Sequence, residues 1–350
     1  MTGVVNGVVA KLKKESEKED EYLQHFHCII HQQTLCSKYL NIRHVLKSVT
    51  KIVNYIRARG LNHRQFIQFM QDIDSEYTDV PYYTEIRWLS SHKVLRRFFE
   101  LRNEIAIFLK SKNYECEILN NDRWIKDLAF AVDITNHLNQ LNLKLQGKNL
   151  VITNLYDNIK AFKYKLLLWE KQLQEENLSH FDCCKSLLQK LPDLNFSEYS
   201  HQINSLRIEF ERRFLDFSTC ENQFQIFTSP FSVDVETVDK NLQLELIEMQ
   251  CDSVLKQKFT EVGVPKFYNY LSINQFPNIL LLAKRVLAMF GSTYLCEQLF
   301  SILKNNKTPE RSRLTDQHVQ SILKIATTNE IEPNFEDLVK EKRCQASSKQ

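Results

Sequence analysis

Cys28 and His31 have the residue types and the spacing of a metal site. Two residues separate them, which gives half of a tetrahedral zinc site, and His25, His27 and Cys36 lie near enough in the sequence to complete it. The alternative is a buried thiol and a hydrogen-bonded histidine that pack a strand against a helix, because isolated ligand pairs rarely form metal sites. We favour the packing role. Cys28 and His31 are therefore weak metal candidates, and we expect no metal or other cofactor.

A long segment without acidic residues suggests a different chemistry, the binding of phosphate groups. No Asp or Glu occurs between residues 22 and 71, although 43 of the 350 residues are acidic. The basic residues of this segment are Lys38, Arg43, Lys47, Lys51, Arg57, Arg59 and Arg64, and a second group follows at Lys93, Arg96, Arg97 and Arg102. Basic surfaces attract phosphate through counterion release, without reading the base sequence. The alternative is a solvated helical face that acidic residues from later in the chain neutralise.

The composition argues against a secreted or membrane protein. The net charge is +3, so the overall charge neither favours nor excludes a nucleic-acid partner. The nine cysteines have no framework spacing, and the N-terminus lacks the apolar core of a signal peptide. The most apolar window, residues 279–290, contains Lys284 and Arg285 and is too short to span a bilayer. We expect a soluble intracellular protein with free thiols.

The scarcity of helix-breaking residues, with six glycines and seven prolines, predicts a mainly α protein. Apolar residues at three- and four-residue steps predict helices over residues 42–56, 95–108, 134–145, 155–173, 203–217 and 242–249. Gly147 lies between the third and the fourth of these, so we expect an antiparallel hairpin that turns there. Residues 22–31 are rich in aromatic and β-branched types and predict a short strand, whereas residues 220–239 predict a loop.

Several motifs resemble those of hAT-superfamily DNA transposases. The C-terminal signature comprises residues 290–301 (FGSTYLCEQLFS), Lys304 and residues 311–316 (RSRLTD). The Cys28-x-x-His31 pair and residues 84–90 (TEIRWLS) resemble the cysteine-histidine and Arg-Trp motifs of the family, and residues 242–247 and 276–278 match its host-gene branch. These motifs cover most of the chain in family order. The branch comprises vertebrate proteins domesticated from Charlie-type elements, including BED-type zinc-finger proteins.

This resemblance implies a catalytic mechanism that the chain does not support. Transposases of the family have an RNase H-like core in which two aspartates and one glutamate hold two divalent metal ions. Glu297 is at the position of the glutamate. In relatives an acidic segment runs directly into Met-Thr-Gly, with which this chain begins, so both aspartates are expected upstream of Met1. We therefore expect an N-terminally truncated, catalytically inactive protein with a vestigial Glu297. The family associates the tryptophan of its Arg-Trp motif with DNA handling, so Arg87 and Trp88 are DNA-binding candidates.

The resemblance also implies a dimerisation region at the C-terminus. An apolar helix face at residues 279–287 and further apolar residues up to Ile325 exceed what so short a region buries within itself. The candidate dimerisation residues are Leu299, Phe300, Leu303, Leu314, Val319, Ile322 and Leu323. The alternative is that they pack onto the helical part of the same chain.

These inferences combine into one expected architecture and function. We expect a remnant of an RNase H-like α/β core at residues 1–40, a large helical insertion domain at 41–275, a core helix and hAT dimerisation region at 276–340, and a disordered tail at 341–350. The expected function is that of a domesticated, non-enzymatic interaction module in the nucleus, with the cytoplasm as a further location. Expected partners are a second copy, related hAT-derived proteins and DNA, but no membrane or small-molecule substrate. The candidate DNA-binding residues are Arg87, Trp88, Lys93, Arg96, Arg97, Lys47, Lys51, Arg57 and Arg59. The alternatives are an active transposase or nuclease, and a fragment of a longer transposase-derived regulator.

Overall fold

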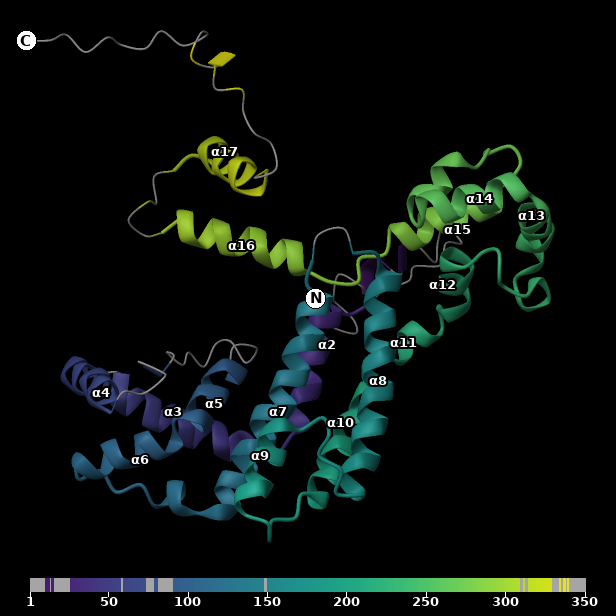
Figure 1. The fold of residues 1–350 in the computed structure, drawn as a ribbon. Coiled ribbons are helices and arrows are strands. Elements are labelled where there is room, and N and C mark those ends of the chain that lie inside the picture. The colour runs from purple at the N-terminus through teal and green to yellow at the C-terminus, as the bar shows by residue number, and fades with distance from the viewer. Residues whose placement is uncertain are drawn as a thin grey trace, which may run out of the picture. The chain divides into compact units, whose positions relative to one another are not determined.

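The described part of the chain folds mostly into helices (Figure 1). The computed structural model describes residues 10–12, 14–15, 26–57, 59–73, 79–80, 91–147, 150–308, 311, 314–328, 334, 336–337 and 339. All regular structure in these residues is helical, which confirms the predicted fold class as mainly α. None of the described helices is long and apolar enough to cross a membrane. The contacts divide the chain into two compact units, residues 1–292 and 293–350; the predicted four-part division stays a prediction.

The expected helical hairpin forms the centre of the first unit. It consists of α7 (Asp122–Leu145) and α8 (Ile152–Gln174), which contact each other and run antiparallel (Figure 1). Gly147 belongs to the segment that connects the two helices. The heptad-like face of α8 packs mainly against α10 (Ser200–Arg213) and less against α7. At the core of this region, Phe130 stacks on Tyr199 with ring centroids 4.2 Å apart. The hairpin prediction is therefore correct, but a third helix contributes most of the contacts to its second half.

A buried carboxylate attaches α9 (Asp182–Lys190) to α7. The two carboxylate oxygens of Asp133 accept hydrogen bonds from the backbone N–H groups of Cys183 and Cys184, at 3.1 and 3.0 Å. These N–H groups belong to the first turn of α9 and have no partner within the helix, so the carboxylate completes the helix start. Burial raises the pKa of Asp133, and the two hydrogen bonds oppose that rise.

Four helices that carry the basic residues precede the hairpin, the first two from the segment without acidic residues. They are α3 (Arg43–Arg57), α4 (Gly60–Asp72), α5 (Ser91–Glu100) and α6 (Arg102–Ser111). The single helix expected over residues 95–108 is thus two helices that meet at Leu101. Both α3 and α5 contact α7 and each other.

The strand expected over residues 22–31 is wrong where the structure describes it. Residues 29–31 belong to α2 (Ile29–Cys36), which packs against α7 and α10; residues 22–25 lie outside the described residues. The backbone N–H of Ile29 donates to the carbonyl of Gly291 at 2.9 Å. A β-carbon at position 291 would lie 2.7 Å from Leu155 Cδ1, so this close approach favours glycine.

The remainder of the first unit is a group of short helices. They are α11 (Leu215–Ser218), α12 (Glu221–Thr228), α13 (Lys240–Cys251), α14 (Ser253–Val262) and α15 (Pro277–Leu287). The loop expected over residues 220–239 is wrong for its first part, because Phe224, Ile226 and Phe227 are buried in α12. The carboxylate of Glu245 on α13 accepts hydrogen bonds from the backbone N–H groups of Asn278 and Ile279, so it caps the start of α15.

The second unit contains two described helices that contact each other, α16 (Tyr294–Asn306) and α17 (Asp316–Thr327). The side chain of Thr315 caps α17 by accepting a hydrogen bond from the backbone N–H of His318. Short 3₁₀ segments complete the described chain, at Ser37–Tyr39, Glu117–Asn120, Ser197–Tyr199, Val235–Thr237 and Lys266–Tyr270.

Candidate functional site

Glu297, the candidate catalytic glutamate, lies exposed in the first turn of α16. The hydroxyl of Thr293 donates a hydrogen bond to its carboxylate at 2.7 Å, as expected for a side chain near a helix start. A two-metal centre needs several carboxylates around the ions. Within the part of the chain that the structure describes, no three His, Cys, Asp or Glu side chains are grouped to hold a metal ion.

Cys28 and His31 lie at the beginning of α2, not on a strand. Cys28 is partly buried just before the helix, and His31 is exposed on it. The buried Cys36 has its pKa raised to about 12 by desolvation. Burial therefore favours the thiol form of Cys36 in the metal-free chain.

Lys47 and Lys51 make the solvent-facing side of α3 basic. Both are exposed, one helical turn apart, while Val45, Val49 and Ile52 face the core. Neither lysine forms an ion pair with another described residue. Within the described part of the chain both charges face solvent, where a phosphate-bearing partner can reach them.

Arg57, at the end of α3, forms hydrogen bonds with residues of its own chain. Its guanidinium donates to Asp79 at 2.9 Å and to the carbonyl of Val80 at 2.5 Å. The ring nitrogen of His63 on α4 lies 2.9 Å from the same carboxylate. This cluster holds residues 79–80 against α3 and α4, so the charge of Arg57 is already used within the chain.

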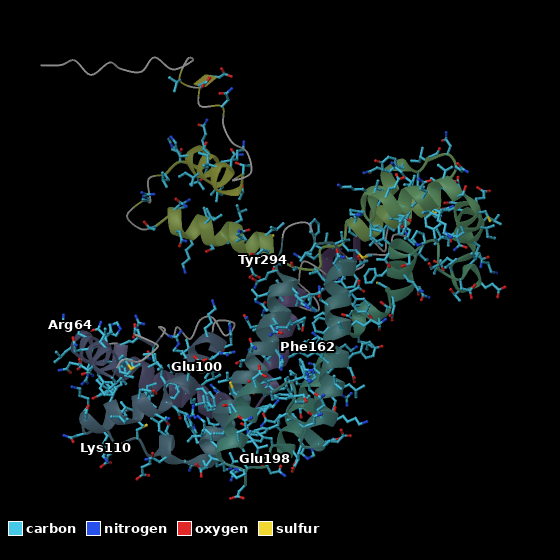
Figure 2. The ribbon with its side chains drawn as sticks, in the orientation of Figure 1. Arg64, Glu100, Lys110, Phe162, Glu198 and Tyr294 are labelled. Atoms are coloured by element: carbon cyan, nitrogen blue, oxygen red, sulfur yellow. The ribbon has the colours of Figure 1, made fainter. Side chains whose placement is uncertain are left out.

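The remaining basic candidates differ in how free their charges are. On α5, Arg96 pairs with Glu100 at 3.0 Å and Arg97 approaches it at 3.8 Å; Glu100 is labelled in Figure 2. Lys93 is exposed, and so is Arg59, whose guanidinium lies 5.9 Å from the ring of Tyr55. Arg87 and Trp88 lie outside the described residues.

The C-terminal helix pair has no buried residue. Phe300 is 65% exposed, and Ile325 on α17 is 74% exposed. The other candidate dimerisation residues are partly or fully exposed: Leu299, Leu303, Leu314, Val319, Ile322 and Leu323. Leu295 is also more than half exposed and was missed among the candidates, although its place one turn before Leu299 predicts a shared face.

The apolar residues of α15, in contrast, lie within the first unit. Ile279, Leu280, Ala283 and Val286 are buried, and α15 contacts α12 and α13. For this helix the alternative interpretation, packing within the same chain, is the correct one.

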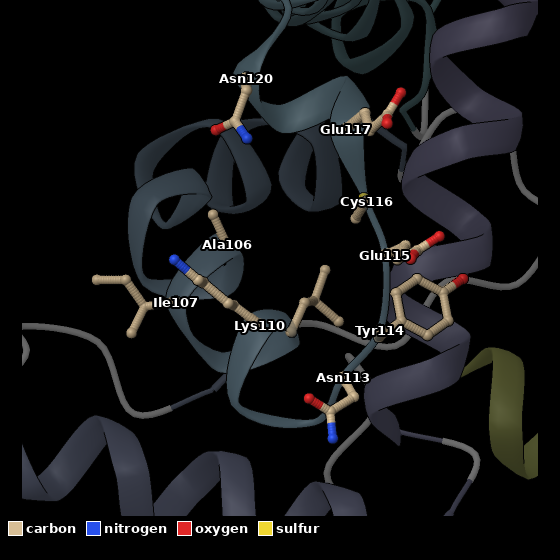
Figure 3. Close-up of a pocket in the computed structure, with 10 residues that line it drawn as sticks. Ala106, Ile107, Lys110, Asn113, Tyr114, Glu115, Cys116, Glu117 and Asn120 are labelled. Atoms are coloured by element: carbon tan, nitrogen blue, oxygen red, sulfur yellow. The ribbon is translucent and has the colours of Figure 1, made fainter.

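An open hollow of about 610 Å³ lies between α6 and the following segment (Figure 3). Its lining combines apolar side chains such as Ile107 with Lys110, Glu115 and Glu117. None of the residues singled out from the sequence lines it.

Comparison with known proteins supports the motif-based resemblance. Residues 27–174 match the FAM200/GTF2IRD2 helical domain, and residues 248–327 match the hAT family C-terminal dimerisation region. The chain is similar to general transcription factor II-I repeat domain-containing protein 2 of Bos taurus, with 43% identity over 93% of this chain, and of Mus musculus, with 43% identity over 86%. It spans about one third of the length of these relatives, 34% and 32%. No solved structure matches it. The chain therefore belongs to the domesticated, hAT-derived proteins that combine a FAM200/GTF2IRD2 helical domain with an hAT dimerisation region.

Proposed function

We propose that this chain is a catalytically inactive interaction module that joins two copies through α16 and α17. The observation that carries the proposal is the absence of any buried residue in these two described helices, despite their many apolar side chains. A helix pair in which no apolar residue is fully buried gains little stability alone and requires a partner surface. The match to a dimerisation region supports a second copy of the chain as that partner.

Replacing Phe300 by aspartate is expected to convert dimers to monomers, because a charge in an apolar interface remains unpaired. Leu323→Asp should act in the same way. Light scattering on the purified chain measures both, and Leu143→Asp, at an exposed leucine of α7 in the other unit, is the matched control. Wild-type mass in both C-terminal variants would contradict the proposal.

The absence of nuclease activity is part of the same proposal. Glu297 is exposed and hydrogen-bonded to Thr293, and the described residues bring no other carboxylates to it that would form a metal site. We also infer a nuclear location, because the relatives are named as transcription-factor repeat proteins.

Weak, non-specific DNA binding is a second candidate function, favoured by the exposed Lys47 and Lys51 of α3, which form no ion pair with another described residue. The double variant Lys47→Glu/Lys51→Glu should bind duplex DNA more weakly and lower the salt dependence of binding by about one unit of log–log slope per lost phosphate contact. Fluorescence anisotropy at several salt concentrations measures both effects. Lys185→Glu/Lys240→Glu changes the net charge equally at exposed sites elsewhere. Equal losses in the two double variants would show that net charge, not the α3 face, is responsible.

A further inference from the structure

The outer face of α8 carries an exposed apolar patch formed by Tyr164, Leu167 and Leu168. Their exposed fractions are 65%, 54% and 46%. Residues three and four apart are neighbours on a helix, so the three side chains form one continuous surface. We call these three residues the α8 patch.

The patch lies outside the packed core that the described residues form. The opposite side of α8 is occupied by Phe162, Leu166 and Trp169, which are buried; Phe162 is labelled in Figure 2. An ordinary surface helix has polar residues opposite its buried stripe, whereas α8 has apolar residues on both sides at this level. A contiguous exposed apolar surface of this kind marks an interaction site more often than isolated exposed leucines do.

Lysines surround the patch. Residues 158–169 contain no acidic residue but include Lys160, Lys163 and Lys165. Lys171 lies about one turn beyond Leu168, the last residue of the patch. Successive residues of a helix are 100° apart, so Lys163 and Lys165 flank Tyr164 on its two sides. Lys160 pairs with Glu221, and Lys171 approaches Glu175 at 3.8 Å. Lys163 and Lys165 pair with no acid among the described residues.

We propose that the α8 patch binds an acidic amphipathic helix of a partner protein. Leucine and isoleucine side chains of that helix would cover Tyr164, Leu167 and Leu168, and its flanking carboxylates would face Lys163 and Lys165. This is helix recognition by an apolar surface, with charge providing the selectivity.

The same observations disfavour other occupants. A second copy of α8 would bring an equally basic surface against the patch, and like charges repel. Nucleic acid would use the lysines but leave the three apolar side chains without partners. The inference is independent of self-association through α16 and α17, because the α8 patch lies in the first unit.

The test uses the full chain and two labelled helical peptides of equal length. Both have leucines at positions i, i+3, i+4 and i+7, with glutamates at the other positions of one peptide and lysines at those of the other. Fluorescence anisotropy should show binding of the acidic peptide, and binding of the basic peptide should be at least about tenfold weaker. Leu167→Asp should abolish binding of the acidic peptide, whereas Leu244→Asp, an exposed leucine on α13, should leave it unchanged.

Charge reversal separates docking from a merely structural role of α8. The double variant Lys163→Glu/Lys165→Glu should lose the acidic peptide and gain the basic one. No binding of the acidic peptide, equal binding of both peptides, or binding unaffected by Leu167→Asp would overturn the proposal. Binding of the chain to anionic phospholipid vesicles that Leu167→Asp abolishes, without peptide binding, would also overturn it.

Discussion

Replacing Phe130 by alanine is expected to lower the free energy of unfolding of the first unit by about 3–5 kcal/mol. Phe130 is fully buried on α7. Its ring stacks on Tyr199 at 4.2 Å and lies 6.2 Å from Phe181, so it joins α7 to the segments that precede α9 and α10. Alanine leaves a cavity and removes both ring contacts.

Urea denaturation followed by circular dichroism measures this loss. Leu143→Ala is the matched control, because Leu143 lies on the same helix but is 59% exposed, and it should change stability by less than about 0.5 kcal/mol. Equal effects of the two substitutions would show that the Phe130 side chain does not support the core.

Replacing Glu245 by alanine is expected to lower the free energy of unfolding by about 2–4 kcal/mol. One oxygen of its carboxylate accepts from the backbone N–H and side-chain amide of Asn278, at 3.0 and 2.7 Å, and the other accepts from the N–H of Ile279 at 2.9 Å. Alanine would leave two backbone donors at the partly buried start of α15 without a protein acceptor. The favourable position of a carboxylate at a helix N-terminus would also be lost.

Glu248→Ala provides the control on the same helix, since Glu248 is exposed one turn later. Glu245→Gln should recover part of the loss, because an amide oxygen still accepts a hydrogen bond. A Glu245→Ala protein as stable as Glu248→Ala would mean that α15 does not require this cap.

The helices predicted most accurately are those whose apolar pattern extends over many turns. The predictions over residues 42–56 and 155–173 match α3 and α8 closely, because a long amphipathic stripe has few alternative conformations. The prediction over residues 134–145 covers only the second half of α7. The composition of residues 22–31 favours a strand, but the run is too short for its apolar pattern to exclude a helix. Tertiary contacts favour the helix. α2 packs on α7 and α10, and the backbone N–H of Ile29 donates a hydrogen bond to the carbonyl of Gly291, which lies far away in the sequence.

The sequence predicts which basic residues belong to the candidate site, but not which of them form ion pairs within the chain. The sequence identifies Lys47, Lys51 and Arg57 as basic residues of one helix, but the pairing of Arg57 with Asp79 depends on the path of the chain after α4. Likewise, the apolar pattern near the C-terminus does not distinguish Ile279, which is buried within the first unit, from Phe300, which is exposed. The difference arises from α12 and α13, against which α15 packs.

Sedimentation equilibrium of the unmodified 350-residue chain tests the central claim most directly. Self-association through α16 and α17 predicts twice the chain mass of 41.5 kDa at high micromolar concentration, decreasing toward 41.5 kDa on dilution. A mass of 41.5 kDa throughout the micromolar range would contradict it.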